Sequence, residues 1–216
     1  MEQQRFEHIR EQAKLMAKRQ NACTEGFRKL VASTNLGELR AVLHEYWSDI
    51  LAMLRKDNFM LLRDYYLSYK TEFNAIGLWF NESTDQGKAI LTEGSFEVFG
   101  NARAWAYENA SVDLNDTARC SAFGKVFVCA RGNSVLSLSD KASCYAYERS
   151  NINANGHSEV DAFESCTITA GEDASVYAHG WNVIKAVGNA QIFAPSSRKI
   201  KLLGNAKLTL KKPEDL

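Results

Sequence analysis

The sequence predicts an α+β protein in which an N-terminal helical region is followed by a right-handed parallel β-helix. Apolar residues recur at three- and four-residue steps up to about residue 80, which is typical of amphipathic helices. From about residue 94 to residue 210, an eight-residue pattern repeats without insertion, which is typical of a solenoid. We expect a helical region over 1–80, a linker and first strand over 81–93, the β-helix over 94–210 and a C-terminal tail over 211–216.

Composition and charge indicate a folded chain with no dominant charged partner. Hydrophobic residues make up 45% of the chain, and 26 basic residues balance 26 acidic ones. Such a chain can bury a core, and neither a nucleic acid nor a membrane is the expected partner. The N-terminus, MEQQRFEHIREQ, is charged and lacks the apolar stretch of a secretory signal. We therefore expect a cytoplasmic protein.

Three helices are expected in the N-terminal region. The apolar stripe of the first consists of Phe6, Ile9, Ala13, Met16 and Ala17. Asn35 and Glu38 have the spacing of a capping box, so a second helix should begin there and continue to Leu54. Asp57 and Asn58 would cap a third, aromatic helix. These faces could pack on each other, on the first turn of the β-helix, or on a partner chain.

Each octad alternates small, aliphatic and small residues at its first, third and fifth positions. The fifth position is Ala or Leu in all fourteen repeats from Ala106 to Leu210. This alternation is the period of a strand with one buried face, and the last three positions are turn-like. One strand and one corner cannot bury their own apolar side, so successive octads must stack.

The comparison of spacings favours three octads per turn. Residues stacked on one another should be alike, and at a spacing of 24 the glycines and the acids of the corners each align. These are Gly132, Gly156, Gly180 and Gly204, and Asp116, Asp140 and Glu164. At a spacing of 16 most glycines fall opposite acids. We therefore expect 24 residues per turn, a triangular cross-section and about five turns, right-handed as parallel crossovers usually are. The alternative is a flat two-sided roll with 16 residues per turn.

The cysteines and histidines predict neither disulfides nor a metal site. The chain has five cysteines, without metal-ligand spacing. Cys120, Cys144 and Cys166 occupy inward positions of the octad and should be buried thiols in a reducing compartment. His157 would stack in a corner with Asn109, Asn133, Trp181 and Asn205, and His179 has too few potential ligands nearby. No cofactor is expected.

Two runs of residues resemble a known kind of repeat. GlyAsnAlaArgAlaTrpAlaTyrGluAsnAla at 100–110 and ValGlyAsnAlaGlnIlePheAla at 187–194 resemble the Gly-Asn-Ala-x-Val-x-Ala octads of uncharacterised bacterial and phage proteins. The resemblance covers the C-terminal half only. It implies a β-helix and suggests an origin in a phage or mobile element, but it implies no activity or site. The period of eight also differs from the repeats of hexapeptide acyltransferases and DNA-mimicking pentapeptide proteins.

Outward positions of the triangular model give the candidate site residues. Acids on one β-helix face could act on a polysaccharide, and the candidates there are Asp113, Glu159, Asp161 and Lys185. Asp113 and Asp161 would lie two turns, roughly 10 Å, apart, slightly beyond the separation in an inverting glycosidase. Lys185, one turn above Asp161, would form a charge pair with it. Exposed aromatics could bind sugar or protein, or be covered by the helices: Trp105, Phe127, Tyr145, Tyr177 and Phe193.

The expected function is a non-enzymatic structural or binding protein that uses a rigid β-helix as its interaction surface. Active sites on solenoids usually bring long corner insertions, and the repeat has none. The expected partner is a protein, or a second copy through the N-terminal helices, with carbohydrate as another ligand class. The alternatives are a carbohydrate-active β-helix enzyme and an inhibitor acting by surface mimicry. All eleven acids of the repeat lie between Glu97 and Asp173, which would also suit head-to-tail association.

Overall fold

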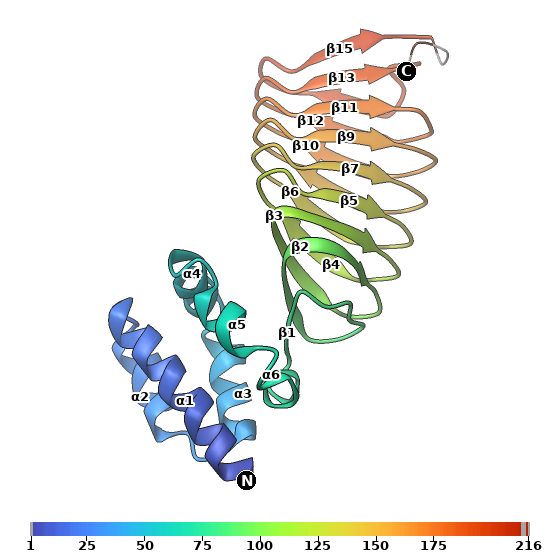
Figure 1. Ribbon diagram of the computed structural model, residues 1–216. Coiled ribbons are helices and arrows are strands. Elements are labelled where there is room, and N and C mark those ends of the chain that lie inside the picture. The colour runs from blue at the N-terminus through green and yellow to red at the C-terminus, as the bar shows by residue number, and fades with distance from the viewer. Residues whose placement is uncertain (1, 213–214, 216) are drawn as a thin grey trace. The chain divides into compact units, whose positions relative to one another are not determined.

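The computed structural model describes residues 2–212 and residue 215. The chain divides into two compact units, Met1–Phe80 and Asn81–Leu216. The first unit is helical and the second is a parallel β-solenoid (Figure 1). Helices followed by a parallel β-solenoid confirm the broad fold prediction. No helix in the described part of the chain combines the length and apolar character needed to span a membrane.

The helical unit contains six short helices in its described residues, where three were predicted. They are α1 (Glu2–Arg19), α2 (Thr24–Ala32), α3 (Leu36–Glu45), α4 (Trp47–Lys56), α5 (Met60–Tyr65) and α6 (Lys70–Ala75), followed by the short strand β1 (Leu78–Phe80). The predicted capping box is confirmed, because the backbone N–H of Glu38 donates to Asn35 Oδ1 at 2.9 Å. The Glu38 carboxylate in turn accepts from the N–H of Thr34 at 2.7 Å.

The extra helices arise from breaks that the apolar periodicity did not reveal. Tyr46 separates α3 from α4 within the predicted second helix. The predicted cap formed by Asp57 and Asn58 is wrong. Asn58 and Phe59 instead adopt left-handed φ values of 49° and 56°, and Phe59 precedes α5 without a side-chain cap. Each break keeps the apolar side of the chain facing inward, so the stripe of buried residues continues across it.

The solenoid is built from one long parallel sheet that folds over on itself. Its strands are β2 (Lys88–Val98), β3 (Arg103–Leu114), β4 (Arg119–Ala122), β5 (Phe127–Ala130), β6 (Val135–Leu138), β7 (Ser143–Ala146), β8 (Asn151–Ala154), β9 (Glu159–Ala162), β10 (Thr167–Ala170), β11 (Ser175–Ala178), β12 (Val183–Ala186), β13 (Gln191–Ala194), β14 (Ile200–Leu202) and β15 (Lys207–Leu210). The even-numbered strands from β4 onward continue the first half of β3, and the odd-numbered strands from β5 onward continue its second half. We call these two sides face A and face B.

The predicted turn of 24 residues is wrong, and the two-sided alternative is what the structure shows. Cys120 pairs with Leu136, and Leu136 pairs with Ile152, each in parallel register 16 residues apart. Two octads therefore make one turn, the cross-section is flat rather than triangular, and there are about eight turns instead of five. Successive glycines at a spacing of 24 alternate between the two corners, so they are not stacked on adjacent rungs.

The inward positions of the octad are confirmed by burial. The aliphatic third positions, such as Leu136, Ile152 and Ile168, are almost fully buried between the two faces. The few polar residues at inward positions include Asn182, whose side chain accepts from the N–H of Cys166 and donates to the carbonyl of Ala162, both at 3.0 Å. Because these bonds satisfy the amide, Asn182 can replace a small apolar residue in the core.

The corners explain why likeness between residues gave the wrong period. In most corners one residue has a left-handed φ, and glycines and acids occupy this position along the stack. One corner contains Gly100, Asp116, Gly132, Glu148 and Glu164, and the other contains Glu108, Gly124, Asp140, Gly156, Glu172, Gly188 and Gly204. The carboxylates of Asp140, Glu148 and Glu172 accept from the backbone N–H sixteen positions earlier, at 2.7–3.1 Å. Stacked corner residues are thus more often complementary than alike, although Glu148 and Glu164, and Gly188 and Gly204, are like pairs.

We expect Gly132→Ala to destabilise the solenoid more than Gly204→Ala. Both glycines have left-handed φ values, 73° and 67°, so both variants carry the strain of a Cβ there, about 1 kcal/mol. A Cβ on Gly132 would lie 2.9 Å from the carbonyl oxygen of Asp116, whereas on Gly204 the nearest atom would be 3.4 Å away. We expect a total loss of about 3 kcal/mol for Gly132→Ala, measured by urea unfolding with circular dichroism. Equal losses would contradict the proposed contact between rungs.

Candidate functional site

Face B gathers most of the residues that the sequence suggested as a site. The structure places seven of the nine candidates on its outer side: Asp113, Phe127, Tyr145, Glu159, Asp161, Tyr177 and Phe193. Trp105 and Lys185 lie on face A instead, on the first half of β3 and on β12. The candidate surface is therefore a single flat side of the solenoid.

The correct period changes the neighbours of Asp161. Its register partners on β7 and β11 are Tyr145 and Tyr177, so the predicted charge pair between Asp161 and Lys185 is wrong. Asp113 and Asp161 lie three rungs apart rather than two, which at the usual strand spacing is about 14 Å. Glu159 and Asp161 project from the same strand, two residues apart.

Aromatic rings on face B contact one another along the stack of strands. Phe127 and Tyr145 meet edge to face, with ring centroids 5.2 Å apart. Tyr177 and Phe193 are stacked in parallel at 4.9 Å. These rings remain partly exposed, and Tyr145 retains 44% of its accessible surface. The result is an apolar but fixed surface, because each ring is held by its neighbour.

A second stack, which the sequence analysis missed, lies in the corner that follows face B. We call Arg131, Tyr147, Phe163 and His179 the corner stack. Arg131 lies over the ring of Tyr147 at 5.6 Å, Tyr147 stacks on Phe163 at 4.9 Å, and Phe163 stacks on His179 at 4.6 Å. These four residues are spaced by 16 in the sequence, which is the signal that could have revealed them.

The corner stack also holds two of the acids on face B. Asp161 lies 3.1 Å from His179 Nε2, and Asp113 accepts from Arg131 at 3.3 Å. In both pairs the acid and its partner are 18 positions apart in the sequence. The same arrangement of acid and partner therefore occurs twice, at positions three rungs apart. Glu159, by contrast, is exposed to solvent. Two of the three candidate acids therefore have structural partners.

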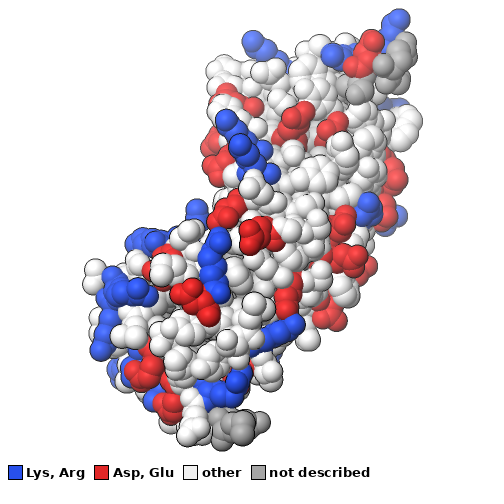
Figure 2. Space-filling model, in the orientation of Figure 1, with Lys and Arg blue, Asp and Glu red and all other residues white. Residues whose placement is uncertain are grey.

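The two faces of the solenoid carry opposite charge. The outward positions of face B and its continuation on β2 carry the acids Glu97, Asp113, Glu159 and Asp161, with Lys207 as the basic residue. The outward positions of face A, among described residues, carry no acid but hold Lys88, Arg103, Arg119, Lys185 and Lys201. Figure 2, oriented with face B toward the viewer, shows acidic side chains on this face and along the edge of the solenoid.

The cysteines are all free thiols, and four of the five are buried. Cys120, Cys144 and Cys166 point into the core as predicted. Burial raises the pKa of Cys120 to about 12 and also raises the pKa of Cys144. Cys129 is an outward residue of face B but is covered by its neighbours, and Cys23 in the helical unit is exposed.

The histidines lie in different surroundings from those predicted. At the true spacing, His157 shares its corner with Lys141 and Asp173, while Asn133 and Trp181 lie in the opposite corner. The part of the chain that the structure describes contains no group of three His, Cys, Asp or Glu side chains close enough to hold a metal ion.

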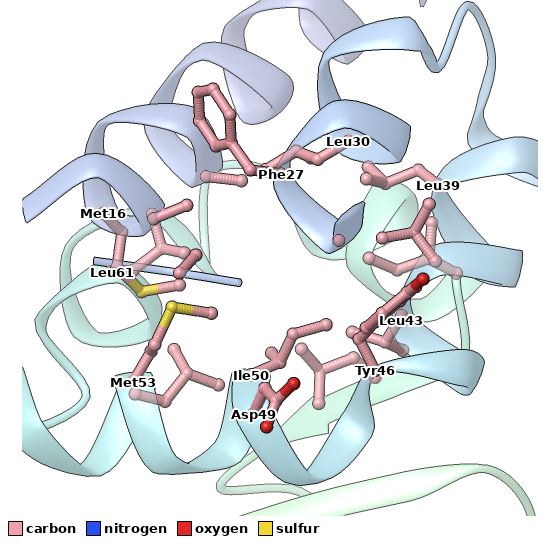
Figure 3. A pocket seen from close by; sticks show the side chains of 18 of the residues that line it. Met16, Phe27, Leu30, Leu39, Leu43, Tyr46, Asp49, Ile50, Met53 and Leu61 are labelled. Atoms are coloured by element: carbon pink, nitrogen blue, oxygen red, sulfur yellow. The ribbon is translucent and has the colours of Figure 1, made fainter. Parts of the chain in front are cut away.

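The helical unit contains an apolar cavity, which we call the helical cavity (Figure 3). It has a volume of about 80 Å³ and is lined by side chains from all six helices. Its floor is buried and includes Met16, Leu30, Leu39, Leu43, Leu54 and Leu62. Its rim is partly exposed and includes Cys23, Phe27, Tyr46, Asp49, Ile50 and Met53.

We expect alkaline pH to destabilise the solenoid through its buried thiols. The pKa of Cys120 is about 12 in the folded chain, against an ordinary value of 9.0. Because the pKa of the thiol is higher in the folded chain than in the unfolded chain, the stability that the neutral buried thiol supports is fully present below pH 9. It is lost as the pH rises toward 12. At pH 10 the loss is about 1 kcal/mol for Cys120, and the raised pKa of Cys144 adds a loss of the same sign. Urea midpoints measured at pH 8 and pH 10 should fall less for a Cys120→Ala, Cys144→Ala double variant, and an equal fall would contradict this origin.

No family model matches the chain, and the searches of curated proteins and of solved structures also return no match. The functional conclusion therefore depends on the geometry of face B and of the helical cavity.

Proposed function

We propose that the protein is a non-enzymatic binding protein that uses face B to hold a basic protein partner. The observation that carries this proposal is the coincidence of acids and aromatic rings on one flat face, while the other face has no outward acid. Aromatic residues are enriched in protein interfaces. An excess of charge of one sign on a surface selects and steers a partner of the opposite sign.

The rigidity of face B also supports binding. Each outward side chain stands on a strand that is hydrogen-bonded to a strand on either side along most of the solenoid. The rings of Tyr177 and Phe193 hold each other, and His179 and Arg131 hold two of the acids. Little conformational entropy is then lost when a partner docks, which favours affinity.

The carbohydrate alternative is less well supported by the arrangement of the rings. A sugar packs against the open face of an aromatic ring. The ring planes of Tyr177 and Phe193 are only 11° from parallel and the rings are stacked, so each covers one face of the other. A protein surface can use ring edges and partial faces, so this arrangement suits a protein partner better.

The enzyme alternative lacks a converging pair of carboxylates. Asp113 and Asp161 are about 14 Å apart by strand spacing, which exceeds the separation in glycosidases of either type. Glu159 and Asp161 are nearer, about 7 Å along one strand, but Asp161 is engaged by His179 and Glu159 is exposed on an open surface. The strands and corners of the repeat from Arg103 to Ala194 carry no insertion that could enclose a substrate.

Surface mimicry is also less well supported. A nucleic-acid mimic must project its carboxylates into solvent, but those of Asp140, Glu148 and Glu172 bind backbone N–H groups within the corners. The resemblance of the octads to bacterial and phage repeats supports a phage or mobile-element origin as part of this proposal. Self-association through the N-terminal helices stays a prediction.

The proposal can be tested with two variants that change the net charge equally on opposite faces. Glu159→Gln with Asp161→Asn adds two positive charges to face B, and Thr167→Lys with Thr169→Lys adds two to face A at the same octad positions. The probe is a fluorescent peptide of alternating lysine and tyrosine, measured by anisotropy at two salt concentrations. We expect the face B variant to weaken binding by about fivefold to tenfold.

The control outcomes separate a specific face from general charge. The face A variant should bind the peptide within about twofold of the unmodified protein, and a peptide with glutamate in place of lysine should not bind. Equal weakening by both variants would contradict a binding role for face B. Turnover of a polysaccharide that Asp161→Asn abolishes would replace the proposal with the enzyme alternative.

A further inference from the structure

We propose that the helical cavity binds the alkyl end of an amphiphile whose head group is positively charged. This inference concerns the helical unit and is independent of the role proposed for face B. It depends on three observations: the apolar interior of the cavity, its accessible rim, and one unpaired carboxylate among the residues that line it.

The interior of the cavity selects an apolar group. Its buried floor is formed by aliphatic, methionine and aromatic side chains, such as Met16, Leu43, Leu62 and Phe73. A cavity with such walls stays free of water, and one of about 150 Å³ is large enough to hold benzene. At about 80 Å³, the helical cavity has room for the end of an alkyl chain but not for a large ring system.

The rim allows such a chain to enter from solvent. Cys23 and Asp49 are exposed, while Phe27, Tyr46 and Ile50 are half-buried. Phe27 of α2 lies across the open centre of Figure 3 from Tyr46, Asp49 and Ile50 at the start of α4. An alkyl chain inserted between them would leave its polar end at the rim, in contact with water.

The charge at the rim selects the head group. Asp49 is the one charged residue among the described residues that line the cavity, and no hydrogen bond or ion pair engages its carboxylate. The nearby Lys29 is already paired with Glu45 at 2.6 Å. An ammonium head would lie beside Asp49, whereas a carboxylate head would be repelled by it. Lys18, over the ring of Phe27 at 6.0 Å, directs a cationic head toward the α4 side of the rim.

Cys23 provides a direct reporter for occupancy. It lines the cavity and is exposed, while the other four thiols are buried, so a disulfide reagent such as DTNB should modify Cys23 first in the folded full-length protein. The ligands are hexylamine, 1-hexanol and hexanoate, which share one chain length. We expect hexylamine to slow the modification of Cys23 at the lowest concentration, about threefold below hexanol, with hexanoate weakest. Shortening the amine by one methylene should weaken binding by about fourfold.

Three variants distinguish the cavity from a non-specific effect. Ala17→Leu places a larger side chain in the cavity and should abolish protection of Cys23, while Ala52→Leu, on the exposed side of α4, should leave it unchanged. Asp49→Asn should make hexylamine and hexanol equivalent without preventing binding. If Ala17→Leu does not fold, as judged by circular dichroism, Ala13→Leu at the half-buried part of the lining replaces it.

Three results would overturn the inference. The first is that no six-carbon compound slows the modification of Cys23, or that protection survives in Ala17→Leu. The second is that Cys23 becomes less reactive as the protein concentration increases without ligand, because a second copy of the chain would then occupy the rim. Hexanoate binding more tightly than hexylamine would exclude a cationic head group.

Discussion

From β3 onward, each inner rung of the solenoid is hydrogen-bonded in parallel to the rungs sixteen residues before and after it. This bonding requires the chain to turn back twice in each rung with a constant rise, and most corners achieve it with one residue in the left-handed conformation. Where that residue is an acid, such as Glu148, its carboxylate binds the amide of the rung before it. Where it is Gly132, the missing Cβ allows the backbone of Asp116 to approach closely. The core and both faces follow from this repeated geometry.

The sequence predicted which side of each strand is buried, but it did not predict which rungs are neighbours. Burial depends on the alternation within one octad, and this local property is visible in the residues themselves. Neighbouring rungs are related by packing, and the packing of glycine against an acid leaves no likeness to detect. The series Tyr147, Phe163 and His179 did carry the true spacing, since stacked rings do resemble one another. Similarity between residues 16 positions apart is thus informative for stacked aromatic side chains, but it is misleading at the left-handed corner positions.

Most residues of face B could be identified from the sequence even though the predicted period was wrong. In a two-sided roll the face of a residue depends on whether its octad is odd or even in the series, and most of the chosen residues belong to alternate octads. Trp105 and Lys185 belong to the other set of octads, and they therefore lie on face A. The helical cavity could not be predicted at all. An apolar stripe indicates which side of a helix is buried, but it does not show whether the side chains fill the space between helices.

The contrast between the units is consistent with the different binding role proposed for each. On a parallel solenoid, outward side chains form columns that run along the stack of strands. Neighbouring side chains are about 4.8 Å apart within a column and about 7 Å apart along a strand. Such a lattice offers many groups to a broad partner, but none of its side chains converge on one atom from several directions. Convergence requires elements that meet at angles, and short helices broken at Tyr46 and Phe59 provide this. A flat protein surface therefore suits the solenoid, while a small apolar group suits the concave interior of the helical unit.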